Sequence, residues 1–193
     1  GYDSLGDIRK AIQYHEKYLK IAIEIGDQNG KGIAYVHLGV SHHSLGDFPK
    51  AMKYLEKGLK IGIEIGNWEI AEAAYSSLGT AYNSLGDFPK AIEYHEKCLK
   101  IAVKIGNRAG EATAYANLGV SYKSLGDLQN AIEYAKKHLK ISVEIGHRAG
   151  EATAYHNIGN GYCQLGQFDI AMDNLVSAVN VFNTLRSQLK SED

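Results

Sequence analysis

The side chains in this chain that are best suited to chemistry are its eight histidines and two cysteines. The adjacent pair His42-His43 could suggest a metal site, but neighbouring helical residues point about 100° apart and rarely bind one ion together. Cys98 and Cys163 form no cluster with histidine that has zinc-ligand spacing. No Ser-His-Asp order, phosphate-binding loop or pair of acids rises above chance. We therefore predict no enzyme activity, no metal and no cofactor.

Bulk composition argues against two further classes of function. The formal net charge of −1 disfavours nucleic-acid binding, which needs a basic surface. No apolar run approaches the roughly 18 residues that span a bilayer, and no signal peptide is visible. The cysteines imply no disulfide framework and are interpreted as free thiols in a reducing compartment. We therefore expect a cytoplasmic protein without a membrane partner. Cys163 is interpreted as a structural residue, although it is the more reactive thiol of the two if either one reacts.

The elements that would position such side chains repeat every 40 residues. Leu-Gly-Asp recurs without insertion or deletion at Leu5-Gly6-Asp7, Leu45-Gly46-Asp47, Leu85-Gly86-Asp87 and Leu125-Gly126-Asp127, then as Leu165-Gly166-Gln167. A fixed period of this size predicts stacked helical units, which recognise partners over an extended surface. Because residue 1 falls inside a repeat, we expect the chain to be part of a longer protein.

Each repeat is predicted to contain two helices. Apolar residues three and four positions apart indicate a first helix over 29–45 and a second over 47–65. Gly46 suits the left-handed position that ends a helix, and Asp47 suits the N-cap of the next. The first type, helix A, recurs at 29–45, 68–85, 108–125 and 148–165, and the second, helix B, at 7–25, 47–65, 87–105, 127–145 and 167–190.

Neither helix can bury its apolar face alone, so antiparallel packing within and between pairs must complete the core. Small residues mark the close contacts: we expect Gly39 to face Ala51, Gly79 to face Ala91 and Gly119 to face Ala131. The in-phase tyrosines, together with His15 and His95, are predicted to be packing residues. The whole chain, 1–193, is predicted to be one array, with a partial repeat over 1–28 and full repeats over 29–67, 68–107, 108–147 and 148–190.

These residues resemble a tetratricopeptide repeat. Its consensus places an aromatic residue, then Leu-Gly, then tyrosine, and alanine in the next helix, and Tyr75, Leu78-Gly79, Tyr82 and Ala91 fit it. The long period and residues 91–102 and 114–119 resemble the subgroup typified by the LGN/Pins/AGS3 adaptors and by TTC28-like arrays. The resemblance implies an all-α, right-handed superhelical solenoid of antiparallel helix pairs, with a concave groove lined by helix A.

The same resemblance implies which exposed helix A positions meet a partner. They are Val36, His37, Val40, His43, Ser77, Thr80, Asn83, Asn117, Lys123, His156, Asn157 and Asn160. An asparagine side chain both donates and accepts hydrogen bonds, so Asn117, Asn157 and Asn160 are expected to grip a peptide backbone, unless they only bind water or a neighbouring repeat. Val36 and Val40 would supply apolar contact.

Two hypotheses of function follow. The first is a non-enzymatic scaffold that binds a peptide segment of a partner protein in the groove. The alternative is an array for self-association, or a regulatory spacer for an attached effector such as the CHAT-type domain of some relatives. The last helix, with Asn180 and Asn183 on a polar face, is predicted to cap the array. The first repeat has no such cap, so weak homo-association there is a further expectation.

Overall fold

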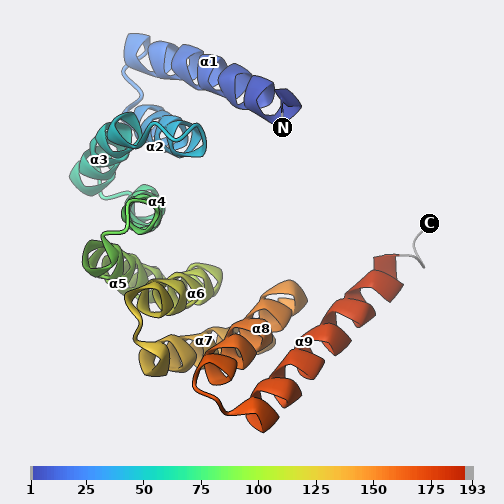
Figure 1. The fold of residues 1–193 in the computed structure, drawn as a ribbon. Coiled ribbons are helices and arrows are strands. Elements are labelled where there is room, and N and C mark those ends of the chain that lie inside the picture. The colour runs from blue at the N-terminus through green and yellow to red at the C-terminus, as the bar shows by residue number, and fades with distance from the viewer. Residues whose placement is uncertain (1, 190–193) are drawn as a thin grey trace. The chain divides into compact units, whose positions relative to one another are not determined.

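The computed structural model describes residues 2–189 and is helical over that range apart from short turns (Figure 1). The helices are α1 (Tyr2–Glu24), α2 (Gln28–Ser44), α3 (Phe48–Glu64), α4 (Trp68–Ser84), α5 (Phe88–Ile105), α6 (Arg108–Leu125), α7 (Leu128–Glu144), α8 (Arg148–Gln164) and α9 (Phe168–Leu189). The all-α class is confirmed. Their contacts group into two compact units, 1–101 and 102–193, whose boundary falls within α5.

The turns that join the helices are built alike. Gly46 has φ +78° and Gly126 has φ +90°, a conformation that costs an L side chain energy and glycine little. After Gly46, the Asp47 N–H donates to the His42 carbonyl over 2.9 Å, which gives a carbonyl group in the last turn of α2 a hydrogen-bond partner. The Asp47 carboxylate then accepts from the Lys50 N–H and caps α3. The predicted glycine stop and aspartate cap are confirmed here.

The first Leu-Gly-Asp does not behave as the sequence predicts. A helix B was expected to start at 7, directly after Gly6, but α1 runs without a break from Tyr2 to Glu24. Gly6 is not among the glycines with positive φ. At the later copies the motif separates two helices, whereas α1 continues through Gly6. The local motif alone is therefore insufficient to stop a helix.

Each unit has its own apolar core between consecutive helices. In the first unit, Leu55 of α3 packs with Leu78 of α4, and neither is accessible to solvent. In the second, Ile132 and Ala135 of α7 pack with Ile158 of α8. These positions follow the three-and-four spacing from which the helices were predicted.

Glycines bring paired helices close together. A Cβ built on Gly39 would lie 2.5 Å from Leu55 Cγ and 3.1 Å from the Ala51 carbonyl oxygen, and one on Gly119 would lie 3.3 Å from the Ala131 carbonyl oxygen. The contacts predicted at Gly39 and Gly119 are confirmed. At Gly79 the three atoms nearest to such a Cβ all belong to the His95 ring, the closest at 2.5 Å. His95 holds the repeat position of Leu55, whose side chain is likewise the nearest group at Gly39.

Tyrosines stack inside each helix pair. In the first unit, Tyr94 of α5 has ring centroids of Tyr75 and Tyr82 at 6.1 and 5.2 Å, and Lys97 Nζ lies 5.1 Å from its ring. In the second, Tyr134 of α7 is stacked on Tyr122 at 5.2 Å. Such aromatic and cation–π contacts add to packing. The prediction that the tyrosines are packing residues is confirmed for these pairs.

The last helix exposes more apolar surface than a capping helix should. Asn180 and Asn183 of α9 are exposed, as predicted. However, Phe168, Met172 and Val179 on the same helix are also more than half exposed. The polar residues identified in the sequence therefore occupy only part of the outward surface of α9, because apolar residues stand between them along the helix.

Candidate functional site

The helix A face of the first unit is formed by α2 and α4, which contact each other directly. Two hydrogen bonds tie them together: His43 Nε2 to Ser84 Oγ over 3.0 Å, and Asn67 Nδ2 to Asn29 Oδ1 over 2.7 Å. Both bonds join side chains one repeat apart. The predicted surface positions of two consecutive repeats therefore lie on one face of this unit, and hydrogen bonds join the two helices that form it.

The residues predicted on α2 divide into exposed and buried groups. His37 is exposed and stacks on His15 of α1 at 5.0 Å, and Val40 is 43% exposed. Burial and the charge of His37 lower the pKa of His15. Val36, expected to be exposed, is only 7% exposed and belongs to the core with Leu55. It was misplaced because a position one residue after the aromatic turns toward helix B here.

On α4 the predicted residues form a short polar row. Ser77 and Asn83 are half-buried and Thr80 is exposed. The Thr80 hydroxyl donates to the Ser76 carbonyl over 3.0 Å, which leaves its oxygen lone pairs directed outward. This row can therefore accept hydrogen bonds from a partner, but it carries no charge.

The second unit presents α6 and α8, which also contact each other. Asn117 on α6 is half-buried and Lys123 is exposed. On α8, the Asn160 amide lies 2.9 Å from His156 Nε2, and Asn157 is half-buried beside them. His156, Asn157 and Asn160 therefore come together on one helix, whereas Asn117 stands on another.

The cysteines and the histidine pair behave as their burial dictates. Cys98 is buried, and burial raises the pKa of its thiol to about 12, so it stays protonated. Cys163 is exposed. His42 is buried and stacks on Tyr54 at 5.4 Å, whereas His43 bonds Ser84. Among the side chains that the structure describes, no three potential ligands come together around a metal position.

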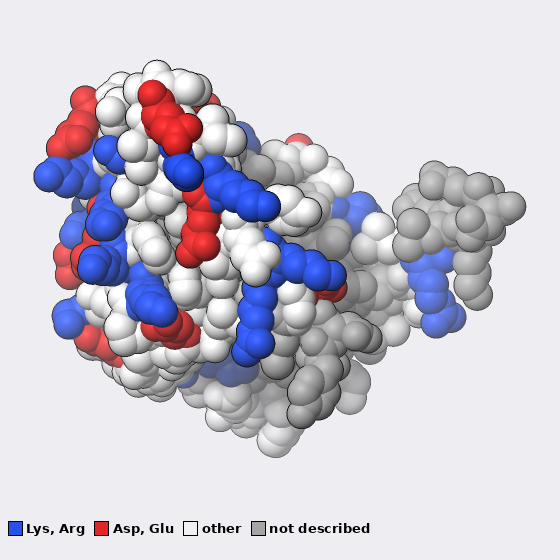
Figure 2. Space-filling view, turned by 90° about the horizontal axis from the view of Figure 1, so that it is seen from above, with Lys and Arg blue, Asp and Glu red and all other residues white. Residues whose placement is uncertain are grey.

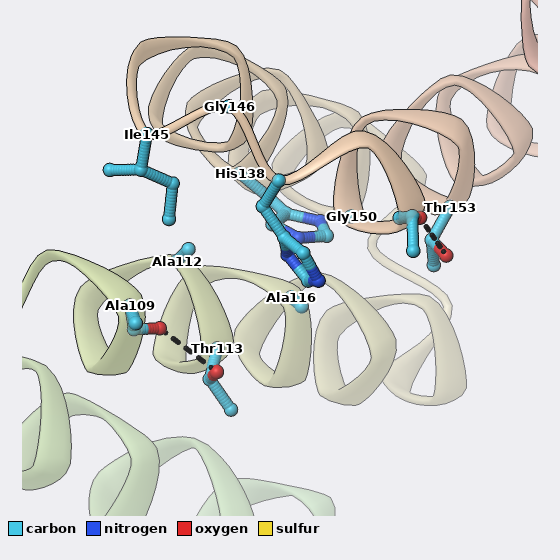
Figure 3. A pocket seen from close by; sticks show the side chains of 11 residues that line it. Ala109, Ala112, Thr113, Ala116, His138, Ile145, Gly146, Gly150 and Thr153 are labelled. Carbon is cyan, nitrogen blue, oxygen red and sulfur yellow. Dashed lines mark hydrogen bonds between the residues drawn. The ribbon is translucent and has the colours of Figure 1, made fainter. Parts of the chain in front are cut away.

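Two depressions lie at the same place in the repeat, between the first turns of neighbouring A helices. One, of about 260 Å³ between α2 and α4, is lined among others by Asn29, Asn67, Glu69 and Ile70. The other, of about 590 Å³ in the second unit, is lined by residues of α6, α7 and α8 (Figure 3). The sequence pattern does not reveal either depression; Ile33 lines the first, and Thr113 lines the second.

Charge is mixed on the molecular surface. On the face that Figure 2 shows, basic and acidic side chains stand among each other without a field of one sign. Several of them pair along a helix, such as Lys97 with Glu93 over 2.6 Å and Arg148 with Glu151 over 2.6 Å. Exposed pairs of this kind contribute little to stability. Because the charges are mixed, local side-chain chemistry matters more than net charge for any contact that this face makes.

The repeat geometry agrees with the comparison to protein families. The model of the tetratricopeptide repeat matches residues 2–64, 69–142 and 124–184. The chain belongs to this family. Its tetratricopeptide repeats are of a kind that serves as a scaffold for protein interaction, and the corresponding fold is typically non-enzymatic. A comparison with curated protein sequences gives no match.

Solved structures give the same fold. BtubC (BKLC) from P. vanneervenii is 25% identical, with a TM-score of 0.85 over 95% of this chain and 76% of that one. MamA is 26% identical, with a TM-score of 0.67 over 96% of this chain and 94% of that one. A signal transduction ATPase from Pyrococcus horikoshii with a tetratricopeptide repeat sensor is 25% identical, with a TM-score of 0.78 over 96% of this chain and 29% of that one.

Among the helices that the structure describes, none combines the length and the apolar character that a membrane crossing needs.

Proposed function

We propose that this tetratricopeptide repeat chain is a non-catalytic scaffold that binds an extended segment of a partner protein along its A helices. The observation that carries the proposal is the clustering of His156, Asn157 and Asn160 on α8, with Asn117 at the corresponding phase of α6. Amide side chains can pair with any peptide backbone, whatever its sequence. The 40-residue period also supports placing the chain in the long-repeat adaptor subgroup of LGN/Pins/AGS3 and TTC28-like arrays.

The other predicted contact residues would contribute to binding to different extents. Val40, His37 and Thr80 offer apolar and polar surface on α2 and α4. Lys123 is an exposed cation on α6. Val36 is nearly buried and contributes shape more than contact area. His43 and Ser77 complete the surface, and Asn83 lies at its end on α4.

A peptide selection followed by substitution tests the proposal. Peptides would be selected against the chain from a displayed random library, and the affinity of the best one measured by calorimetry. Each backbone hydrogen bond contributes about 1 kcal/mol, so the triple variant Asn117→Ala/Asn157→Ala/Asn160→Ala should raise Kd at least about tenfold. The double variant Asn180→Ala/Asn183→Ala on α9 is the control. An unchanged Kd for the triple variant contradicts the proposed site.

Self-association is the second candidate function. Ile21 and Ile23 of α1 and Ile25, which directly follows that helix, are each more than half exposed, so three apolar side chains lie at the surface within five residues. A second copy that covered them would bury apolar area and stabilise a dimer. Light scattering over a range of concentrations tests this. A dimer that disappears in the Ile21→Lys/Ile25→Lys variant supports self-association, and a monomer at every concentration rules it out.

A regulatory role for an attached effector is a version of the same alternative. In the Pyrococcus horikoshii neighbour the repeats are a sensor of a larger protein. By analogy, occupation of the A-helix face here would change the state of a linked domain. The corresponding measurement is the activity of such a domain in the longer protein with and without the selected peptide. An unaltered activity at saturating peptide removes this version.

A further inference from the structure

The depression of the second unit differs from its counterpart in the chemistry of its wall. It has a volume of about 590 Å³ and lies between the first turns of α6 and α8, with the end of α7 behind it. Figure 3 shows the His138 ring in the space between Ala116 of α6 and Gly150 of α8. Ala109, Ala112 and Thr113 form the α6 side. The cavity is therefore lined by small residues together with the buried imidazole of His138.

The helix start at this cavity lacks a cap that the other A helices have. In α2, α4 and α6 a side-chain oxygen accepts from the N–H three residues later: Asp27 from Gly30 over 2.9 Å, Asn67 from Ile70 over 3.1 Å and Asn107 from Gly110 over 2.9 Å. In α8 the N-cap is His147, whose side chain makes no such bond. The first-turn N–H groups of α8 therefore miss the oxygen that the fold supplies elsewhere.

An independent observation also indicates a missing partner. His138 is 5% exposed, lines the cavity, and its Nδ1 has no hydrogen-bond partner. Ser142 Oγ is equally buried and unpartnered, and it lies behind Gly150, where a Cβ would come within 2.7 Å of it. Buried polar atoms in proteins are nearly always hydrogen-bonded, because leaving one unpaired costs about 1–3 kcal/mol. Of these two atoms, His138 Nδ1 belongs to a residue that lines the cavity, and it marks a position for a ligand oxygen.

We propose that this cavity binds a carboxylate of the partner segment, either an aspartate or glutamate side chain or the C-terminal carboxylate. The inference rests on the proposed function, since it names one group that the scaffold reads on its partner. The carboxylate would accept from the first-turn N–H of Gly150, from the Nδ1–H tautomer of His138 and from the His147 ring. It would thereby act as the missing cap, at the end of the helix dipole that favours negative charge.

Local charges favour this ligand over its alternatives. No aspartate or glutamate lines the cavity, whereas Glu69 lines the counterpart in the first unit. The nearest acid on α8, Glu151, is already paired with Arg148 over 2.6 Å. Burial and the charge of His147 lower the pKa of His138, so its ring is neutral near pH 7 and offers one N–H. A carboxylate therefore meets donors here without meeting another carboxylate.

Three capped tripeptides test the proposal on the whole chain, with readouts at the cavity itself. N-acetyl-Ala-Glu-Ala amide carries a side-chain carboxylate, N-acetyl-Ala-Ala-Ala with a free C-terminus carries a terminal one, and N-acetyl-Ala-Gln-Ala amide carries neither. The backbone amide of Gly150 and the ring nitrogens of His138 are followed by NMR during titration. We expect saturable shifts with at least one carboxylate probe and none with the glutamine probe.

A matched pair of variants separates the cavity from general electrostatics. His147→Asn installs the cap found at Asn67 and Asn107, so the fold should persist while the carboxylate loses its position, and Kd for the probe should rise at least tenfold. Lys140→Asn removes an exposed charge of α7 outside the cavity, and its Kd should match that of the unaltered chain. Stability of both variants is checked by thermal unfolding.

The possible results either support or overturn the proposal. Shifts with only the glutamate probe assign the site to an acidic side chain, and shifts with only the free C-terminus assign it to a chain end. Equal shifts with the glutamine probe, no shifts with any probe, or unchanged binding in His147→Asn overturn it. The tripeptides do not require the asparagine surface, so failure here and failure of the proposed groove are seen in separate experiments.

Discussion

The two depressions occupy the same place in the repeat, one in each unit, and yet they invite different ligands. In the first unit the side chains satisfy each other: Asn67 caps α4 and also donates to Asn29, and Ile70 occupies the space behind them. Eighty residues later those three positions are His147, Ala109 and Gly150, and the cavity is larger and has unpartnered polar atoms. The same backbone arrangement is thus closed by its own side chains in the first unit, whereas it leaves an open cavity in the second.

The largest effect that bears on this comparison is the loss of a core leucine in either unit. Leu78 of α4 and Leu118 of α6 hold the same position in the repeat and are both inaccessible to solvent. Either leucine-to-alanine substitution should lower the free energy of unfolding by about 3 kcal/mol, because it leaves a cavity. Chemical denaturation measures the loss of stability, and hydrogen exchange shows which helices lose protection.

Hydrogen exchange decides whether the units respond separately. In a repeat array, stability is a sum of local and neighbouring terms. Leu78→Ala should therefore reduce protection mainly in 1–101 and Leu118→Ala mainly in 102–193, the two units. An equal loss of protection across both units in each variant would show one cooperative body, and the comparison between units would lose its energetic meaning.

Acid should destabilise the first unit through a single buried histidine. His95 is inaccessible, both of its ring nitrogens are unpartnered, and burial lowers its pKa from 6.5 to about 4. The folded state keeps the ring neutral while the unfolded state takes up a proton below pH 6.5. The contribution of the neutral ring to stability is therefore fully present above pH 6.5. It is lost as the pH falls toward 4, which lowers the free energy of unfolding by up to about 3 kcal/mol, at about 1.4 kcal/mol per pKa unit.

The variant His95→Leu isolates this contribution. Leu55 and Leu175 stand at the same repeat position and pack over Gly39 and Gly159, so leucine fits there. Unfolding curves of the variant and the original chain should agree in their carboxylate-driven changes and separate progressively below pH 6.5. Parallel stability profiles between pH 7 and pH 4 would show that the His95 ring is not kept neutral by the fold.

The sequence allowed most of the fold to be predicted, because a glycine that needs positive φ recurs at every turn and an oxygen-bearing cap follows it at every turn except the one at His147. Bounds of α2 to α9 agree with the expected ones within one or two residues. The predicted start of a helix at 7 was wrong, because Gly6 does not adopt a positive φ and α1 continues through it. Among the predicted groove residues, Val36 was wrongly expected to be exposed, because its burial depends on how α2 is rotated against α3. Rotation of that size follows from side-chain shapes, which periodicity does not contain.

The cavity of the second unit could have been suspected earlier, but not understood. Histidine stands at 147 where the other A helices begin with Asp27, Asn67 and Asn107, and this break is visible in the repeat. Its meaning depends on two facts that only coordinates supply. The other three side chains really do cap, and His138 and Ser142 lie unpartnered beside the fourth helix start.

Glycine at the helix crossing provides a finer comparison between the units. Gly39→Ala would place its Cβ 2.5 Å from Leu55 Cγ, whereas Gly119→Ala meets its nearest atom, the Ala131 carbonyl oxygen, at 3.3 Å. Alanine improves helix propensity by about 1 kcal/mol, and overpacking costs about 1–3 kcal/mol. We expect Gly39→Ala to destabilise by about 1–2 kcal/mol and Gly119→Ala to be near neutral. Equal losses in thermal unfolding would mean that both crossings are equally tight.

The smallest effect concerns the caps themselves, and it is the most direct test of the difference between the depressions. Replacing a good N-cap costs about 1 kcal/mol, and installing one recovers a similar amount. Asn67→His should therefore lower the free energy of unfolding by about 1 kcal/mol, since it removes both the bond to Ile70 and the bond to Asn29. His147→Asn should raise it by about 0.5–1 kcal/mol.

The opposite signs are what matter, because both substitutions exchange the same two residue types at the same repeat position. Denaturant unfolding of the two single variants and the double variant measures them, and additivity is expected since the sites lie in different units. If His147→Asn gave no gain, the first turn of α8 would already be satisfied and the cavity would have no vacant acceptor position. A gain in stability together with a loss of carboxylate binding would mean that this helix start gives up intrinsic stability to keep a position for its ligand.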